Sequence, residues 1–550
     1  NPGGSEIQKN ALGTLMFDIL KEELHSQNED ISCFQYLRAK LHSSPQRQWS
    51  VGEMADICRV SVPHFFVLCR RYYGCSPYAM LKKIRLEQAK ELLKNLGLKV
   101  KVTEEYDMTN KIDVGSVIKT DYLPNETVKK GTMIFVTIRK EGTFQDPDVP
   151  YVDPLVAERG EVKQGANSDY VPLNYEIMKA VWISQFDLQG VLTEGLQRAE
   201  ESFRELFGNL CEALAKDGYN TVIVQLRPYG DSFYPSQYYP WSNYAVGSYG
   251  LYGSYDPLKV MVEEAHKVNL SFQAWINPMR AYGDRNTINN INVIYPLRQW
   301  YDNPKKYPNY VYWHNNYYYL NVAYEEVRQL IIDGAAEIVR NYDVDGVHLD
   351  DYFYPTGISD KFDEAVFSKS GFRDRKLFRK DNINKLVSGL YSAIKAENKN
   401  VLFGISPAGN INNVRNACLL DIDTILANKG YVDYIMPQIY WGFEHPTQPY
   451  KTCLANWQAL VKEPSIKFIV GLTASNIASP SGEFIKNKNV FKQYLAHAKS
   501  TEKFDGICIF SVATLYGMFT AKLSSNEGVQ QEMRNFLPLF KTLRNKKIEY

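Results

Sequence analysis

The stretch DVDGVHLDDYFYP, from Asp343 to Pro355, joins a short apolar run to a set of reactive groups. The run ends in the paired carboxylates Asp350 and Asp351, and the ring of Tyr352 follows at once. Carboxylates supply the acid, base or nucleophile of glycoside hydrolysis, and aromatic rings stack on the apolar faces of sugars. The pattern therefore favours chemistry on a carbohydrate. The alternative is a strand end whose aspartates cap the next helix or bind a structural cation.

Seven further apolar runs of similar length surround this one in the second half of the chain, with helical stretches between them. Short continuous apolar runs are typical of parallel strands that are covered on both faces. The eight expected strands are Lys179–Ser184, Thr221–Leu226, Ser271–Ile276, Gly346–Asp350, Val401–Ser406, Asp433–Met436, Lys467–Leu472 and Gly506–Ser511. The helices between or after them include Leu196–Ala215, Tyr324–Asn341, Asn382–Glu397 and Gln530–Leu543. Eight such units predict a (β/α)8 TIM barrel. The alternative is an open doubly wound sheet, but the segment after the first strand, SQFDLQG, is not a glycine-rich phosphate loop.

Polar and aromatic residues follow five successive strands of this predicted barrel, where active sites of such barrels gather. We expect the catalytic carboxylates to be Asp350 first, then Asp351 and the loop residue Asp231. The expected substrate-binding residues are Gln225, Arg227, Tyr234, Trp241, Trp275, Asn277, Arg280, Tyr352, Gln438, Tyr440 and Trp441. Glu444 is a second loop candidate for the general acid. We interpret Asp256, which precedes Pro257, as a helix cap, and His348 as a hydrogen-bonded barrel residue rather than a metal ligand.

Several ordered motifs between residue 178 and about residue 515 resemble the bacterial glycosyl-hydrolase-like 10 family. They include VQLRPYGDSFYPSQYYPWS, AWINPMRAY, DVDGVHLDDYFYP, FGISPAGN and VDYIMPQIYW. The resemblance implies a barrel that acts on bacterial glycans, with chains derived from peptidoglycan as a substrate class. The sequence departs from the family at Gln273, where a histidine is usual, at Asn321-Val322-Ala323, and in INNVRN. Asp345 to Tyr352 also echoes the DGxDxDxE motif of family 18 chitinases, but Tyr352 stands at the position of the acid.

The first 95 residues are helical by pattern. Ser50 and Glu53 form a capping box, a tight turn at Val60-Ser61 joins two short helices, and a long third helix starts at Ser76-Pro77. GCSP and IRLEQAKELL resemble the AraC-type DNA-binding domain with its helix-turn-helix. The resemblance implies DNA binding through residues 49–93, with His64, Arg70 and Arg71 near bases or phosphates. The second helix-turn-helix of that family is absent. Residues 1–95 contain 13 basic and 10 acidic residues, a small positive charge for a segment that would bind duplex DNA.

Residues 96–140 alternate as strands do and resemble a PASTA repeat at Gly115, Val117, Pro124, Val128, Gly131 and Ile134. This predicts a small α+β module, which is interpreted as a spacer. Residues 141–175 are rich in proline, glycine and aspartate and are expected to be a linker to the barrel domain at 176–550. The predicted organisation is therefore a helical domain at 1–95, the module at 96–140, the linker and the barrel.

Length, net charge and cysteine spacing exclude several classes of protein. A chain of 550 residues with a net charge of +1 is too long for one core and is not a strongly basic protein. No apolar run is long enough to cross a bilayer, and the first ten residues lack the pattern of a secretory signal. The eight cysteines show no C-x-x-C spacing, so we expect neither a zinc site nor any other metal or cofactor.

Three hypotheses follow from these modules. The leading one is a glycoside hydrolase with accessory N-terminal modules, acting on a polysaccharide or a peptidoglycan-derived glycan. The second is a glycan-responsive transcription regulator that binds DNA, and the third is a wall-binding protein with an inert barrel. A helix-turn-helix and the lack of a signal favour the cytoplasm, whereas the other two segments favour the cell wall, so localisation is left open.

Overall fold

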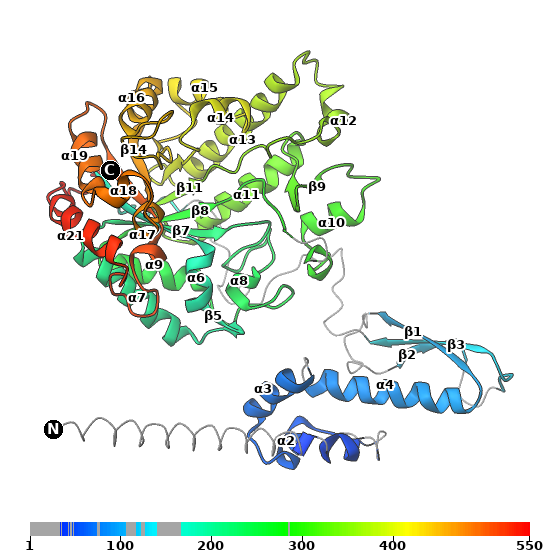
Figure 1. Cartoon of the computed structure of the whole chain (residues 1–550). Coiled ribbons are helices and arrows are strands. Elements are labelled where there is room, and N and C mark those ends of the chain that lie inside the picture. Colours follow the sequence, from blue (N-terminus) through cyan, green and yellow to red (C-terminus); the bar gives the residue numbers. More distant parts are fainter. Residues whose placement is uncertain are drawn as a thin grey trace, which may run out of the picture. The chain divides into compact units, whose positions relative to one another are not determined.

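The computed structural model describes residues 33–34, 36–41, 43, 47, 49–73, 77–105, 117–122, 127–139, 167–283 and 287–550. The chain divides into two compact units, residues 1–149 and residues 150–550; in Figure 1 the first runs from blue to cyan and the second from cyan through green and yellow to red. Each unit is treated by itself below.

The larger unit is a closed barrel of eight parallel strands in the order β11-β12-β13-β14-β15-β4-β7-β8. Its strands are β4 (Met178–Ile183), β7 (Thr221–Arg227), β8 (Ser271–Ile276), β11 (Gly346–Leu349), β12 (Leu402–Ile405), β13 (Tyr434–Ile435), β14 (Lys467–Thr473) and β15 (Gly506–Phe510). Every one of them coincides with a predicted strand to within two residues. The predicted TIM-barrel architecture is thereby confirmed.

Helices connect and surround the strands (Figure 1). The longer ones are α7 (Glu200–Lys216), α9 (Pro257–Lys267), α11 (Glu325–Asn341), α13 (Arg375–Glu397), α16 (Tyr450–Leu460), α19 (Val490–Lys499) and α21 (Glu527–Lys541). Shorter elements are α6 (Gln185–Leu192), α8 (Asn243–Val246), η1 (Thr287–Asn290), α10 (Pro296–Asp302), η2 (Asp360–Phe362), α12 (Glu364–Phe367), α14 (Ile411–Asn416), α15 (Ile422–Ala427), α17 (Ser475–Ala478), α18 (Glu483–Lys486) and α20 (Val512–Leu515).

The first predicted helix of the barrel begins later than expected. Leu196 was predicted to start it, but α7 begins at Glu200. Thr193–Glu194 (β5) instead pairs with Leu196–Gln197 (β6), and Gly195 between them has a φ of 75°. Glycine adopts that left-handed conformation without the steric cost that other residues bear, so the chain turns back here before the helix starts.

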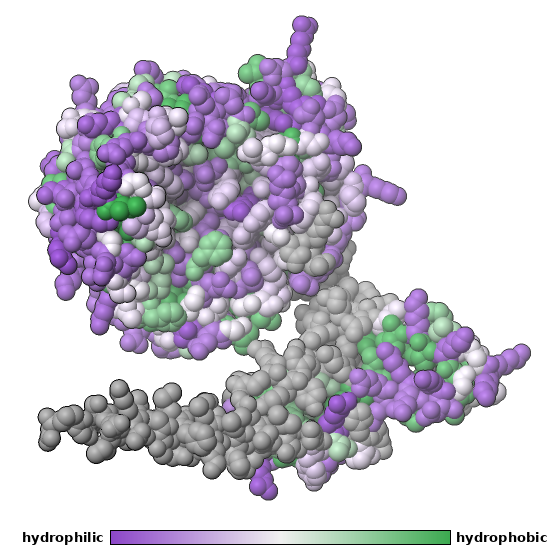
Figure 2. All heavy atoms as spheres, in the orientation of Figure 1, coloured by the Kyte–Doolittle hydropathy of each residue, from purple (hydrophilic) through white to green (hydrophobic). Residues whose placement is uncertain are grey.

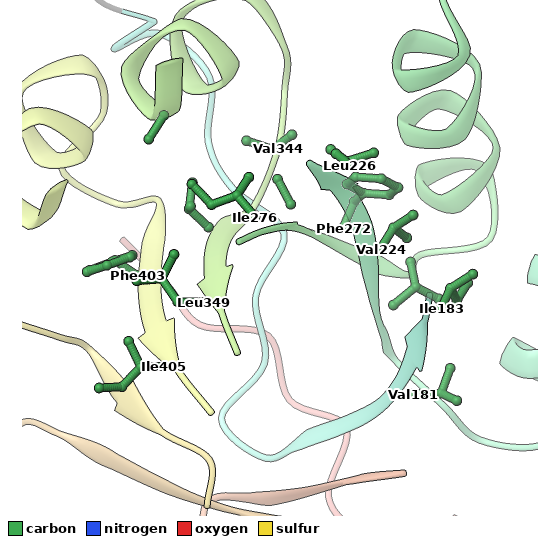
Figure 3. Packing of buried hydrophobic residues seen from close by; sticks show 14 of the residues in the cluster. Val181, Ile183, Val224, Leu226, Phe272, Ile276, Val344, Leu349, Phe403 and Ile405 are labelled. Atoms are coloured by element: carbon green, nitrogen blue, oxygen red, sulfur yellow. The ribbon is translucent and has the colours of Figure 1, made fainter. Parts of the chain in front are cut away.

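Alternate residues of each strand build two separate cores. Val181, Ile183, Val224 and Leu226 point outward into the cluster that packs beneath the helices, as Figure 3 shows from close by. Trp182 and Ile223 belong instead to a second cluster inside the barrel, together with Trp275 and Tyr434. Strand periodicity of two explains this division, because successive side chains point to opposite faces.

The amino ends of the strands form the floor of the barrel, opposite the predicted site. Asp345, just before β11, is fully buried and accepts hydrogen bonds from the Tyr170 hydroxyl (2.6 Å) and the Phe272 amide (2.6 Å). Residues 167–175, predicted to be part of the linker, therefore lie against the barrel. Gln273 also belongs to this floor, since its amide donates to the Asn174 side chain (3.0 Å).

The smaller unit contains α2 (Val51–Ile57), α3 (Val62–Tyr73), α4 (Pro77–Asn95) and a three-stranded sheet. The predicted capping box of Ser50 and Glu53 begins α2. The strands β1 (Lys99–Glu105), β3 (Met133–Arg139) and β2 (Val117–Thr120) lie in that order, with β1 parallel and β2 antiparallel to β3. Exposed apolar side chains gather on this sheet, as Figure 2 shows in green; they are Val117, Met133 and Phe135.

The described residues contain no helix long and apolar enough to cross a membrane.

Candidate active site

Asp350 follows the last residue of β11 and is 3% exposed. Its two carboxyl oxygens accept hydrogen bonds from different directions: the Trp275 indole N–H donates to Oδ2 (3.1 Å) and the Tyr352 backbone N–H donates to Oδ1 (3.1 Å). Trp275 lies inside the barrel on β8, which pairs with β11. The carboxyl group is thus held in one orientation at the carboxyl end of the barrel.

Asp351 is half-buried, and the side chain of Gln438, which follows β13, lies close enough to lower its pKa while the Gln438 amide donates to the Ser406 carbonyl (3.0 Å). Burial and the neighbouring charge of Asp351 raise the pKa of Asp350. Burial also raises the pKa of Asp351, while the Gln438 side chain and the charge of Arg280 oppose that rise. Two close carboxyl groups resist being ionised together, so the pair favours the state that holds one proton and one negative charge.

Arg280, four residues beyond β8, lies near both carboxylates and among aromatic rings. Its guanidinium carbon is 4.2 Å from the centre of the Tyr352 ring, 4.5 Å from Tyr317 and 5.3 Å from Tyr229. Tyr317 lies on a hairpin formed by β9 (Val311–His314) and β10 (Tyr317–Leu320). Tyr352 is 44% exposed, so this aromatic group borders solvent.

His348 lies wholly inside the barrel beneath this group. The Trp182 indole N–H, which can only donate, points at its Nε2 (3.1 Å), and the Tyr434 hydroxyl lies 2.8 Å from its Nδ1. Burial lowers the pKa of His348 to about 3. His348 is therefore a neutral, hydrogen-bonded residue, as predicted, and no group of three or more metal-ligating side chains occurs in the described ranges.

Two more predicted residues lie together at the ends of β7 and β8. The Gln225 amide donates to Asn277 Oδ1 (3.0 Å), and its own oxygen accepts the Gln185 backbone N–H (3.1 Å). Asn277 is 1% exposed, and its Nδ2 has no hydrogen-bond partner among the described residues. A buried donor without a partner is costly, and a ligand hydroxyl or carbonyl would satisfy it.

Tyr440 and Trp441 lie on the β13 side of the barrel mouth. Burial and then the charge of Asp351 raise the pKa of Tyr440, which places its hydroxyl in the field of the paired carboxylates. Trp441 is half-buried and packs against the backbone at Gly409, where an added Cβ would come within 2.7 Å of the indole ring. Glu444 is exposed on the same loop.

The structure places four predicted site residues elsewhere. Arg227 points toward α11, because the register of β7 shifts between Gln225 and Arg227; its guanidinium stacks on Tyr239, 3.8 Å from the ring centre. Tyr234 is buried against Tyr342, which follows α11. Trp241 is 2% exposed and lies under Gly253. These side chains hold the β7 loop in place instead of joining the Asp350 group.

Asp231 is the fourth of these residues. It is fully buried and accepts hydrogen bonds from the Tyr229 backbone N–H (3.1 Å) and the Tyr249 hydroxyl (3.1 Å) of its own loop. Burial raises its pKa to about 6. These partners indicate that Asp231 organises the loop. The loop in turn places the Tyr229 ring against Arg280. Asp256 caps α9 through the backbone N–H groups of Leu258 and Lys259, as predicted.

Tyr317 is a site residue that the sequence interpretation missed. The signal was present, since Asn315-Asn316 separates two aromatic runs and both residues have positive φ, 44° and 65°. Asparagine tolerates this conformation, and a two-residue turn of this kind is the usual connection of a tight β-hairpin.

In the smaller unit, the predicted DNA-binding residue His64 lies exposed on α3, and its backbone N–H donates to the Ser61 hydroxyl (3.4 Å). The side chains of Arg70 and Arg71 lie outside the described residues. DNA binding by this segment stays a prediction.

Comparisons with known proteins identify related families and structures. The family profile described as Glycosyl hydrolase-like 10 matches residues 177–490, and the PASTA domain profile matches residues 81–140, so the latter match begins within α4. Glycosyl hydrolase YngK of Bacillus subtilis is 35% identical over 320 residues, which are 54% of this chain and 61% of that protein. Glycosyl hydrolase DigH of Escherichia coli is 30% identical over 338 residues, 55% of this chain and 74% of that protein. The glycoside hydrolase domain of PgaB from Bordetella bronchiseptica superposes with a TM-score of 0.42 at 11% identity, covering 60% of this chain and 93% of that domain.

Proposed function

The chain belongs to the glycosyl hydrolase-like 10 family, and from this premise we propose that its barrel is a glycoside hydrolase that cleaves a bacterial glycan derived from peptidoglycan. The single observation that carries the proposal is the Asp350–Asp351 pair at the tip of β11, with Asp350 held by the Trp275 indole and the Tyr352 backbone N–H. The chain spans 61% of the length of the YngK protein.

The carboxyl pair supplies the two protonation states that hydrolysis of a glycosidic bond needs. One acid must protonate the leaving oxygen, and one carboxylate must activate water or attack the sugar. Asp350 is the more buried of the two residues and lies next to a like charge, so it retains the proton to the higher pH. We assign Asp350 as the proton donor and Asp351 as the charged partner at neutral pH.

The surrounding side chains suit a sugar. The Tyr352 ring lies beside the carboxyl pair, the Tyr317 ring packs on Arg280, Gln438 lies near Asp351, and Asn277 offers an unused N–H donor after β8. Rings that pack on the apolar faces of a pyranose, together with amide groups that reach its hydroxyls, are the usual means of holding a carbohydrate. These groups follow three strands of one barrel, β8, β11 and β13, and Tyr317 comes from the hairpin of β9 and β10.

The test is Asp350→Asn in the full chain, incubated with purified peptidoglycan glycan strands and followed by mass spectrometry of the released fragments. Because the amide cannot donate a proton as a carboxylic acid does, turnover should fall by about 100-fold or more. Asp423→Asn changes an exposed side chain of α15; it is the matched control and should cleave like the unmodified protein. Circular dichroism melting should show that both variants are folded. Equal turnover by Asp350→Asn and the control would end the proposal.

A further inference from the structure

Arg280 is a cation at the candidate active site without a carboxylate partner among the described residues. Several other arginines of the barrel unit are ion-paired, such as Arg204 with Glu264 (2.8 Å), Arg375 with Asp363 (2.6 Å) and Arg379 with Asp363 (2.6 Å), whereas Arg227, which also lacks an ion pair in the described ranges, lies away from the carboxyl pair against Tyr239. Arg280 has no such pair within 4.0 Å in the part of the chain that the structure describes, and its Nε is buried without a hydrogen-bond partner there. The charge and N–H donors of an arginine in that state are available to bind an anionic ligand.

The aromatic rings around Arg280 leave its N–H donors available. Tyr352, Tyr317 and Tyr229 lie within 5.3 Å of its guanidinium carbon, so they interact with the guanidinium as a cation. The five N–H donors lie in the plane of the group and match the two oxygens of a carboxylate. Tyr352 takes one contact with the guanidinium. The rings therefore hold Arg280 in position and leave most of its N–H donors available to a ligand.

A neutral sugar would not need such a group. Asp350 and Asp351 make the carboxyl end of β11 negative, and they would repel an acidic substrate unless a cation stood beside them. Arg280 lies close enough to lower the pKa of both carboxyl groups, although it forms no ion pair with either. Its place thus allows a third carboxylate, brought by a ligand, to enter next to the catalytic pair.

We propose that Arg280 binds a carboxylate carried by the sugar at the cleavage site, so that the substrate is an acidic glycan and not a neutral one. This inference rests on the proposed glycoside hydrolase activity and adds the residue that recognises the charge of the substrate. Either an O-lactyl ether or a C6 uronate provides the same chemistry: two coplanar oxygens on a pyranose, within reach of the guanidinium.

The experiment compares pairs of glycans that differ only in their charge. The full chain is assayed on oligosaccharides of alternating N-acetylglucosamine and N-acetylmuramic acid, and on the same oligosaccharides after reduction of each carboxyl group to an alcohol. A glucuronate-containing oligosaccharide and its reduced form make the second pair. The quantity measured is the ratio of kcat/KM between the acidic and the reduced member of each pair.

We expect this ratio to be about tenfold or more for the unmodified protein on one of the two pairs, since a hydrogen-bonded charge pair contributes about that much. The pair that shows the preference identifies the source of the carboxylate. In Arg280→Gln the ratio should fall to about one. Arg544→Gln, which removes an exposed positive charge near Glu176, is the matched control and should keep the preference.

Two results would overturn the inference. One is a ratio near one for the unmodified protein on both pairs. The other is a ratio that is unchanged in Arg280→Gln, which would mean that Arg280 only balances the charge of Asp350 and Asp351. If none of the four glycans is cleaved, the proposed function fails as well, so the two failures are distinguishable. Thermal melting checks that Arg280→Gln is folded.

Discussion

At the scale of single residues, the orientation of one carboxyl group depends on its neighbours. Asp350 accepts one hydrogen bond from a barrel tryptophan and one from its own turn, so neither oxygen is free to rotate. The bond from Trp275 also favours the charged form of Asp350 and opposes the rise in its pKa that burial causes. Trp275 therefore affects both the aim and the acidity of the proposed proton donor.

The variant Trp275→Phe tests this role. Phenylalanine keeps a ring in the barrel but loses the N–H, so the pKa of Asp350 should rise further. The loss of activity at alkaline pH, which reports deprotonation of the acid, should then move upward by about one pH unit. Turnover at the optimum should fall about tenfold because the carboxyl group is less well held. The pH dependence of kcat/KM measures both effects, and an unmoved or lowered alkaline limb would contradict the assignment.

At the scale of secondary-structure elements, the eight strands could be predicted because each is a short apolar run that buries both faces. The hairpin of β9 and β10 was missed because its runs are aromatic throughout and show no clean alternation. Arg227 was assigned to the site from its place at a strand end. The register shift in β7, which turns it toward α11, depends on pairing with β8 and leaves no mark in the local sequence. Burial of Tyr234 and Trp241 likewise depends on how a long loop folds back.

The packing of α11 over Arg227 leads to a prediction. A Cβ added at Gly334 would lie 2.5 Å from the Tyr239 ring and 2.7 Å from an Arg227 nitrogen. Gly334→Ala should therefore lower the free energy of unfolding by about 1 to 3 kcal/mol through overpacking. Because Arg227 lies away from Asp350, kcat/KM well below the melting temperature should stay within about twofold.

The matched control is Gly190→Ala in α6, where the nearest atom to an added Cβ is 3.6 Å away. Alanine suits a helix better than glycine, so this variant should be as stable as the unmodified protein or slightly more so. Chemical denaturation measures both. Loss of activity in folded Gly334→Ala would show that Arg227 and Tyr239 do influence the site.

At the scale of the whole molecule, the barrel domain needs more chain than its strands and helices. Asp345 is fully buried and depends on donors from residues 170 and 173, which precede β4. The family match begins only at residue 177, after these donors. Periodicity could not reveal this contribution, because the segment has an irregular backbone and a composition typical of linkers.

Two fragments test whether residues before 176 belong to the barrel domain. Residues 150–550 should melt cooperatively at the temperature of the barrel in the full chain. Residues 176–550 would leave the Asp345 carboxylate buried with fewer donors, which should cost about 3 kcal/mol or more. Differential scanning calorimetry makes the comparison, and Tyr170→Phe in the longer fragment isolates the loss of one hydroxyl. Equal melting of the two fragments would mean that residues 167–175 are dispensable.

The same floor fixes where the barrel domain is anchored. The Ile548 backbone N–H donates to the Asn174 carbonyl (2.8 Å), and the Glu176 N–H donates to the Lys546 carbonyl (2.9 Å). Tyr175 and Lys547 form an isolated antiparallel β-bridge. A force that pulls on the chain before residue 167 would load these hydrogen bonds before it loaded any strand of the barrel. The deformation would then occur at the end of the barrel remote from Asp350, and the distances on which proton transfer depends would not change.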